Sequence, residues 1–284
     1  MVLRGKRLSF QTKISDIHFT MTSSKEDWLA RADDVLQTLL SGKPLSIAAV
    51  QRLREEIKLE TTYDSNAIEG STLTLRETVL VVKEGVDCIP GKPIQDVLAA
   101  RGFAAGFDTI FSFVENGIPL TVSLISEFHK YVMLGALSEF CGVFRDHNMR
   151  ILGTHCKTAE HWEIPERIQK LVDRFNTADN VVHPIEKAAR FHAALETIHP
   201  FSDGNGRTGR LLLNYMLVRE GFWPVNIRYA EDRVPYYDAL ASYNETGNAE
   251  DLTCLIAQRA TEQLEYCIEI ALQQEAAQAM RQQC

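Results

Sequence analysis

The feature that most constrains the fold of this chain is a glycine-rich turn between two helical segments. The segment Pro184–Ile198 carries apolar residues at helical spacing and begins with a proline, which suits a first helical position. The turn after it contains Gly204, Gly206 and Gly209 in a GxGxxG pattern, and a leucine-rich helical segment follows over Arg207–Glu220. A dinucleotide-binding GxGxxG needs a strand before its first glycine. Because a helix is expected there, the pattern favours a helix–turn–helix site over a Rossmann fold.

A turn of this kind suits an anion. It presents several backbone N–H groups at a helix N-terminus, where the helix dipole also favours negative charge. Arg207 and Arg210 lie in the same turn, His199 stands at its start as a candidate proton acceptor, and Asp203 offers the hard oxygen that Mg²⁺ prefers. Taken one by one, the same residues also fit solvated arginines, a structural histidine and a turn-capping aspartate.

Helical patterns dominate the rest of the chain. They cover residues 27–40, 46–59, 74–85, 94–114, 121–134, 165–175, 236–243 and 251–280. Between Gly142 and Trp162, two short apolar runs, 143–145 and 149–152, predict a small β-hairpin, and Val225–Tyr229 gives a further strand signal. We therefore expect an all-α bundle with a small β-hairpin.

Charge and composition exclude some classes of protein. Thirty basic against 38 acidic residues give a net charge of −8, which argues against broad nucleic-acid or membrane-surface binding. No stretch reaches the roughly 18 apolar residues of a membrane span, and the N-terminus lacks the apolar run of a signal peptide. The six cysteines are too widely spaced for CxxC chemistry. A cytoplasmic protein without a nucleic-acid or membrane partner is expected.

The run His199-Pro-Phe-Ser-Asp-Gly-Asn-Gly-Arg-Thr-Gly-Arg210 resembles the HxFx(D/E)GNGRxxR signature of Fic-domain proteins at every fixed position. The resemblance implies an all-helical Fido fold. It also implies transfer of a nucleotide monophosphate, usually AMP from Mg-ATP, onto a hydroxyl of a target protein. Doc-type kinases of the same superfamily have a lysine at the position of Gly206, so the resemblance favours nucleotidyl transfer.

The same resemblance assigns roles within the turn. It makes His199 the general base and Asp203 the Mg²⁺ ligand. The phosphate contacts that it implies are the backbone amides of Gly204 and Gly206 with Asn205, and the side chains of Arg207 and Arg210.

Two further segments are similar to parts of the family. The predicted hairpin, within about 143–162, is similar to the flap that holds a target by strand pairing; the implied target contacts are Met149, Arg150, Ile151 and Leu152. The segment 236–244 resembles the one that closes over the nucleoside; the implied adenosine contacts are Tyr236, Tyr237, Leu240 and Asn244. By its own pattern, this last segment is a helix with an apolar stripe.

An inhibitory segment is indicated upstream. Ser65-Asn-Ala-Ile-Glu69-Gly70 matches the (S/T)xxxE(G/N) pattern of many Fic proteins. With a helix through Ile68, Glu69 would lie at a C-terminal end, where an anion gains from a cationic partner. The resemblance implies that Glu69 pairs with Arg210 and occupies the space of the γ-phosphate, so that the α-phosphate of ATP is misaligned. An autoinhibited protein adenylyltransferase is therefore expected.

These expectations divide the chain into a helical cap over residues 1–58, a Fic core over 59–260 with the inhibitory helix at about 60–70, and a helical tail over 261–284. The expected partners are ATP and a target protein that the sequence does not identify. Related proteins often dimerise, so the resemblance is also compatible with a homodimer.

Four alternatives stay open. In the first, Glu69 positions a water molecule that removes AMP from a modified target. In the second, the chain is a nucleotide-binding regulator without enzymatic activity. A dinucleotide oxidoreductase would use Glu231 or Asp232 on the ribose. A metal site can be drawn through four residues whose spacing matches no standard zinc pattern, namely His147, His155, Cys156 and His161.

Overall fold

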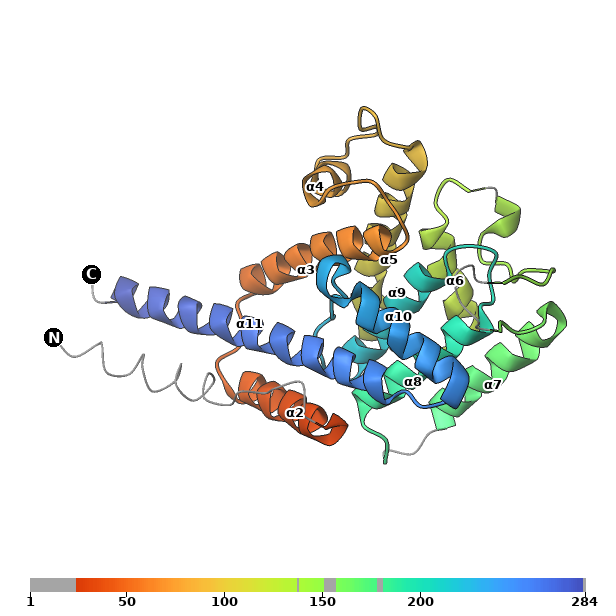
Figure 1. The fold of residues 1–284 in the computed structure, drawn as a ribbon. Coiled ribbons are helices and arrows are strands. Elements are labelled where there is room, and N and C mark those ends of the chain that lie inside the picture. The colour runs from red at the N-terminus through yellow and green to blue at the C-terminus, as the bar shows by residue number, and fades with distance from the viewer. Residues whose placement is uncertain (1–23, 137, 151–156, 178–180, 283–284) are drawn as a thin grey trace.

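The computed structural model describes residues 24–136, 138–150, 157–177 and 181–282, and these form a helical bundle (Figure 1). Its α-helices are α2 (Lys25–Ser41), α3 (Ile47–Ile68), α4 (Leu75–Val82), α5 (Ile94–Glu115), α6 (Val122–Val132), α7 (Ile164–Thr177), α8 (Pro184–Ile198), α9 (Asn205–Arg219), α10 (Tyr229–Thr246) and α11 (Glu250–Gln282). Two short 3-10 helices cover Ser138–Phe140 and His161–Glu163. The described residues contain no strand, so the all-α expectation is confirmed and a Rossmann sheet is excluded among them.

The centre of the bundle is α9. Every residue from Thr208 to Leu217 is buried, and the helix contacts α3, α5, α6 and α8. A helix that is apolar on nearly every side must be enclosed in this way. The turn that precedes α9 is therefore attached to a helix that the core encloses.

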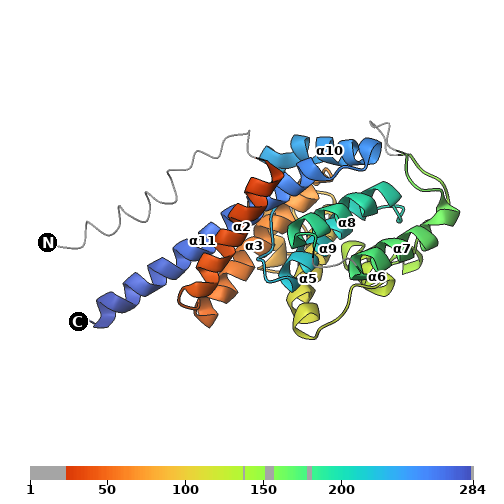
Figure 2. The same ribbon diagram turned by 90° about the horizontal axis from the view of Figure 1, so that it is seen from below.

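The long helix α11 runs past the body of the bundle, and α2 packs along it (Figures 1 and 2). α11 also contacts α8 and α10. The division of the chain after residues 58 and 260 falls inside α3 and α11, both of which continue without a break. That division stays a prediction about function, since neither position is an interruption of the fold.

The expected strand at Val225–Tyr229 is absent. Residues 225–228 form no regular element, and α10 begins at Tyr229. The side chain of Asn214, from α9, donates through Nδ2 to the Val225 carbonyl (3.1 Å) and accepts from the Val225 N–H (2.7 Å). A buried carboxamide thus takes the place of a neighbouring strand, which the apolar pattern alone could not reveal.

The predicted hairpin is not seen in the part of it that the structure describes. Residues 143–150, including Met149 and Arg150, contain no strand, whereas Ile151 and Leu152 lie outside the described residues. This region is organised by the buried side chain of Arg145, which donates to four backbone carbonyls. The acceptors are His199 at 2.8 Å, His147 at 2.6 Å, Ala159 at 2.5 Å and Ile198 at 3.4 Å. Side-chain donors therefore satisfy carbonyls that a strand ladder would otherwise engage.

One expectation about membranes needs correction. By length and composition, α5 is apolar enough to cross a membrane, with a mean hydropathy of 1.4 over its best window. In this structure α5 packs against α3, α4, α6 and α9, and Phe103, Phe107 and Ile110 are fully buried. A search for uninterrupted apolar residues does not detect α5, because a few polar residues interrupt its apolar sequence.

Candidate active site

The turn between α8 and α9 is closed by Asn205. The Asn205 Oδ1 accepts from the Phe201 N–H (2.9 Å), and its Nδ2 donates to the Phe201 carbonyl (2.7 Å). Both residues are buried. The Asn205 side chain therefore holds the loop, instead of facing an anion as the resemblance implied. Its backbone belongs to the first turn of α9, whose N–H groups lack acceptors within the helix.

His129, from α6, supports the same turn, and sequence reasoning did not find it. Its ring stacks on Phe201 at 3.7 Å between centroids. The Gly142 N–H donates to Nδ1 (2.8 Å), so Nε2 carries the hydrogen and donates to the Asp203 carbonyl (2.9 Å). Burial lowers the pKa of His129 to about 4. Its hydrogen-bond partners lie 13 and 74 residues away, which left no local signal.

His199 ends α8 in a left-handed conformation, with φ 52° and ψ 63°. It is the one non-glycine residue with positive φ in the described part of the chain, and such backbone outliers cluster at functional sites. Its carbonyl accepts from Arg145 Nε, which fixes this conformation. Burial lowers the pKa of the half-buried His199 imidazole, partly opposed by the nearby Glu196 carbonyl. The imidazole is therefore neutral at neutral pH and able to accept a proton.

Asp203 lies on the exposed side of the turn and pairs with Arg207, whose side chain is only 11% exposed. Arg207 Nη2 lies 3.3 and 3.4 Å from the two Asp203 carboxylate oxygens, and the Asp203 side chain is 70% exposed. The Gly204 N–H donates to Asp203 Oδ1 (2.6 Å), so this amide orients Asp203. One accessible carboxylate suits Mg²⁺, which takes its other ligands from phosphates and water.

Arg210 lies three residues beyond Arg207, yet it is buried. Its Nε donates to Ser65 Oγ (2.8 Å), and its Nη2 donates to the Ser65 carbonyl (2.9 Å) and to Glu69 Oε1 (2.7 Å). Burial opposes the charge of Arg210, but Glu69 outweighs it and raises the pKa of the guanidinium. The predicted pairing of Glu69 with Arg210 is confirmed, and the serine of the inhibitory pattern contacts the same guanidinium.

Gly206 leaves the space that Glu69 fills. A Cβ at this position would lie 2.2 Å from Glu69 Oε1 and 3.0 Å from Arg210 Nη1. The absence of a side chain at Gly206 is thus a condition for the ion pair. The sequence pattern gave this glycine only a role in the anion-binding turn.

Of the expected adenosine contacts on α10, Tyr236 does not reach the surface. It is 1% exposed, its hydroxyl lies 2.7 Å from His192 Nε2, and its ring lies 6.0 Å from the Arg210 guanidinium. Tyr237 is 42% exposed and its hydroxyl donates to the Ile68 carbonyl at 3.4 Å. Leu240 and Asn244 follow Tyr237 on the same side of α10 and are partly exposed.

The alternative metal site gains no support among the described residues, which contain no cluster of three metal-binding side chains. Two of its four members, His155 and Cys156, lie outside them. The described pair has other partners: His147 contacts Asp146, and His161 contacts Asn148.

Fold and site together define a helical protein in which a glycine-rich turn between two buried helices lies against a carboxylate from a distant part of the chain. Residues 119–217 match the model of the Fic/DOC family. The chain is 34% identical over 225 residues to the protein adenylyltransferase Fic of Nematostella vectensis, and 33% identical over 199 residues to fic-1 of Caenorhabditis elegans. These alignments cover 77% and 68% of this chain but only 51% and 38% of the relatives, so the chain spans about half of their length or less.

Solved structures agree with these matches. A fragment of Fic-1 from C. elegans superposes with a TM-score of 0.78 at 26% identity, covering 96% of this chain and 77% of that one. A Fic-domain signalling protein from Bacteroides thetaiotaomicron gives a TM-score of 0.75 at 26% identity, with 86% and 96% coverage. The chain belongs to the Fic/DOC family.

Proposed function

We propose that this chain is an autoinhibited protein adenylyltransferase that moves AMP from Mg-ATP to a hydroxyl side chain of a target protein. The relatives named protein adenylyltransferase support this class of reaction. The observation that carries the proposal is the position of Glu69. It is paired with Arg210 inside an otherwise complete phosphate-binding turn.

In the proposed reaction, the target hydroxyl gives its proton to the neutral His199 imidazole while its oxygen attacks the α-phosphorus of ATP. The bond from that phosphorus to the bridging oxygen of the β-phosphate breaks, and pyrophosphate leaves. The N-terminal amides of α9 and Arg207 hold the phosphates. Asp203 would hold Mg²⁺, which neutralises phosphate charge when bound. Tyr237, Leu240 and Asn244 are the proposed adenosine contacts.

Inhibition follows from charge and space. Arg210 cannot hold Glu69 and a γ-phosphate in one place, because both are anions and the guanidinium is buried. With Glu69 in place, ATP binds with its α-phosphate displaced from the line of attack. The defect lies in substrate position, so removal of the Glu69 side chain is expected to restore transfer.

Incubation with α-labelled ATP tests both claims. Glu69→Gly should label itself and a target about tenfold or more above the unsubstituted chain, as expected for an allosteric-scale coupling. Adding His199→Ala to that variant should reduce labelling by about 100-fold or more. His183→Ala, at the opposite end of α8, is the matched histidine control. Equal labelling with and without Glu69 would contradict inhibition, and full labelling without His199 would contradict its role.

The target can be found with the same variant. Cell lysate treated with Glu69→Gly protein and ATP would be searched by mass spectrometry for AMP on tyrosine, threonine or serine. The double variant Glu69→Gly/His199→Ala supplies the background. Adducts present in equal amount in both samples would contradict the proposed transfer.

Removal of AMP is the second candidate, and the exposure of Glu69 favours it. The Glu69 side chain is 35% exposed, and Arg210 engages only its Oε1. Its other oxygen can orient a water that attacks the phosphorus of a modified target, so that AMP leaves and the hydroxyl is regenerated. Release of AMP from a modified target by the unsubstituted chain, but not by Glu69→Gly, would support removal.

We further propose a cytoplasmic location, on the basis of six widely spaced cysteines, and the lack of nucleic-acid or membrane partners, on the basis of the net charge of −8. Cell fractionation tests the location. Light scattering over a range of concentrations tests for a homodimer.

A further inference from the structure

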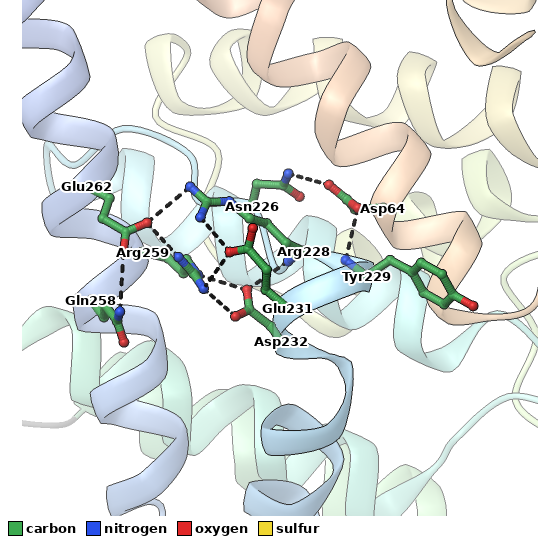
Figure 3. A network of polar contacts seen from close by, with 9 residues as sticks. All are labelled: Asp64, Asn226, Arg228, Tyr229, Glu231, Asp232, Gln258, Arg259 and Glu262. Atoms are coloured by element: carbon green, nitrogen blue, oxygen red, sulfur yellow. Dashed lines mark hydrogen bonds and ion pairs between the residues drawn. The ribbon is translucent and has the colours of Figure 1, made fainter. Parts of the chain in front are cut away.

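Asp64 connects the inhibitory end of α3 to the start of α10. Its Oδ1 accepts from the Tyr229 N–H (2.9 Å), and its Oδ2 accepts from Asn226 Nδ2 (2.6 Å), as Figure 3 shows. Asp64 is 9% exposed and directly precedes Ser65. A carboxylate at a helix N-terminus satisfies free N–H groups and is favoured by the helix dipole. Both oxygens of Asp64 are thus engaged by donors outside α3, although burial raises the pKa of its carboxyl.

The start of α10 is itself fixed to α11. Arg259 Nε donates to Asp232 Oδ2 (2.8 Å), and both side chains are buried. Arg228 pairs with Glu262 of α11 (3.0 Å), and the Arg228 N–H donates to Asp232 Oδ2 (2.8 Å). Figure 3 shows these ion pairs beside Asp64. Asp64 thus attaches α3 to the start of α10, which is held in place by α11 through ion pairs that do not involve α3.

Both polar and apolar contacts hold this end of α3. Of its buried residues, Asp64 and Ser65 bond groups outside the helix, Asn66 bonds the Thr62 carbonyl within it, and Ile68 packs in the apolar core. Hydrogen bonds are directional and apolar packing is not, so the Asp64 and Ser65 contacts set the orientation of this helix end. Beyond Asp64, the side-chain contacts converge on Arg210, and a small cavity between them is lined by Ser65, Arg210 and Asn226. Glu69 follows Asp64 by about one and a half helical turns.

We propose that Asp64 is a positioning residue for inhibition: by fixing α3 on the start of α10, it keeps Glu69 within reach of Arg210. The inference rests on the proposed function, because it assigns Asp64 a role within autoinhibition. Loss of the Asp64 contacts allows the last turn of α3 to move away from α10. Glu69 then competes less well with the γ-phosphate of ATP for Arg210. The effect of Asp64 on transfer therefore depends on the presence of Glu69.

The test is a double-substitution cycle with α-labelled ATP at saturating concentration, with KM for ATP measured alongside. In the chain that has Glu69, Asp64→Ala should raise the rate of labelling by about fivefold or more, the lower range of typical coupling between sites. In the Glu69→Gly chain, Asp64→Ala should leave the rate within about twofold, because nothing is left to position. Asp64→Asn keeps one acceptor oxygen and should give an intermediate rise.

Two further variants separate coupling from general damage. Asn226→Ala removes one Asp64 contact from outside α3, and it should give a smaller rise that again requires Glu69. Glu166→Gln removes an exposed ion pair with Lys170 on α7, outside this network, and it should give no rise. An unchanged or lower rate for Asp64→Ala, or the same change with and without Glu69, would overturn the inference. If Asp64→Ala does not fold, Asn226→Ala tests the inference in its place, again by whether a rise in labelling requires Glu69.

Failure of the proposed function would give a different result, namely equal labelling by the unsubstituted and Glu69→Gly chains.

Discussion

Two regions meet at Arg210, and they are held in opposite ways. The catalytic turn has local clamps of its own: Asn205 binds Phe201, and Arg207 binds Asp203, each across four residues, while His129 and Arg145 add contacts from other segments. The end of α3 is fixed by residues 141 to 165 positions away, namely Arg210, Asn226 and Tyr229. The comparison shows that the turn has local side-chain clamps, whereas the pairing of Glu69 with Arg210 depends entirely on contacts between distant segments. The proposed inhibition could therefore be lost while the turn stays intact.

The largest effect on stability is expected from the two hydrogen bonds between the Asn205 side chain and the Phe201 backbone, here called the clamp. Asn205→Ala leaves the buried N–H and carbonyl of Phe201 without partners, at about 1–3 kcal/mol each, so the free energy of unfolding should fall by about 3 kcal/mol. Asn116 is the matched control, since its exposed side chain also bonds a carbonyl four residues earlier. Urea unfolding should show a loss under about 1 kcal/mol for Asn116→Ala. Equal losses would contradict a special role of the clamp.

Acid should weaken the support that His129 gives to the turn. Its folded-state pKa of about 4 lies below the usual value near 6.5, so the unfolded chain takes up the proton first. The free energy of unfolding therefore falls as the pH drops from about 6.5 to about 5, by about 2 kcal/mol for this residue. Urea unfolding at both pH values should show a loss that is smaller by about 2 kcal/mol in His129→Gln than in the unsubstituted chain, because His192, whose pKa burial also lowers, is present in both. Identical pH slopes would refute the assignment.

A substitution at Gly206 tests the contact between the turn and Glu69 at the end of α3. The new methyl group of Gly206→Ala would overlap Glu69 Oε1, so it should displace the carboxylate and raise labelling from α-labelled ATP by about tenfold. The same substitution in the Glu69→Gly chain should not raise labelling, which controls for direct effects on the turn. A fall in labelling in both chains would mean that the alanine damages phosphate binding instead.

The smallest effect is expected at Arg207. Its ion pair with Asp203 is solvent-accessible on the aspartate side, so Arg207→Gln should change the free energy of unfolding by less than about 1 kcal/mol. Arg210→Gln is the matched substitution and should cost more, because it removes three hydrogen bonds from a buried group. Comparable costs at both positions would contradict the distinction between local and long-range support.

Sequence reasoning succeeded where signals are local or periodic. The helices, the catalytic turn and the pairing of Glu69 with Arg210 were all expected, the last from the charge at a helix end together with the family resemblance. It could not find His129 or Asp64, because their partners are distant in sequence. It also placed Tyr236 among the adenosine contacts, because a sequence pattern does not show whether a side chain on α10 faces the site or is buried beneath it. It placed Val225 in a strand, because an apolar pattern does not show whether the backbone pairs with a strand or, as here, with the side chain of Asn214.

Arg145 has a consequence for any target that docks beside the catalytic turn. Its guanidinium binds the carbonyls of His147 and Ala159 on one hand and of His199 on the other. A planar group with donors at fixed angles acts as a spacer of set length, which a lysine of equal charge would not reproduce. The segments on either side of residues 151–156 are thereby held at a fixed distance from His199, so in the proposed reaction one buried side chain would set how far a docked hydroxyl stands from its base.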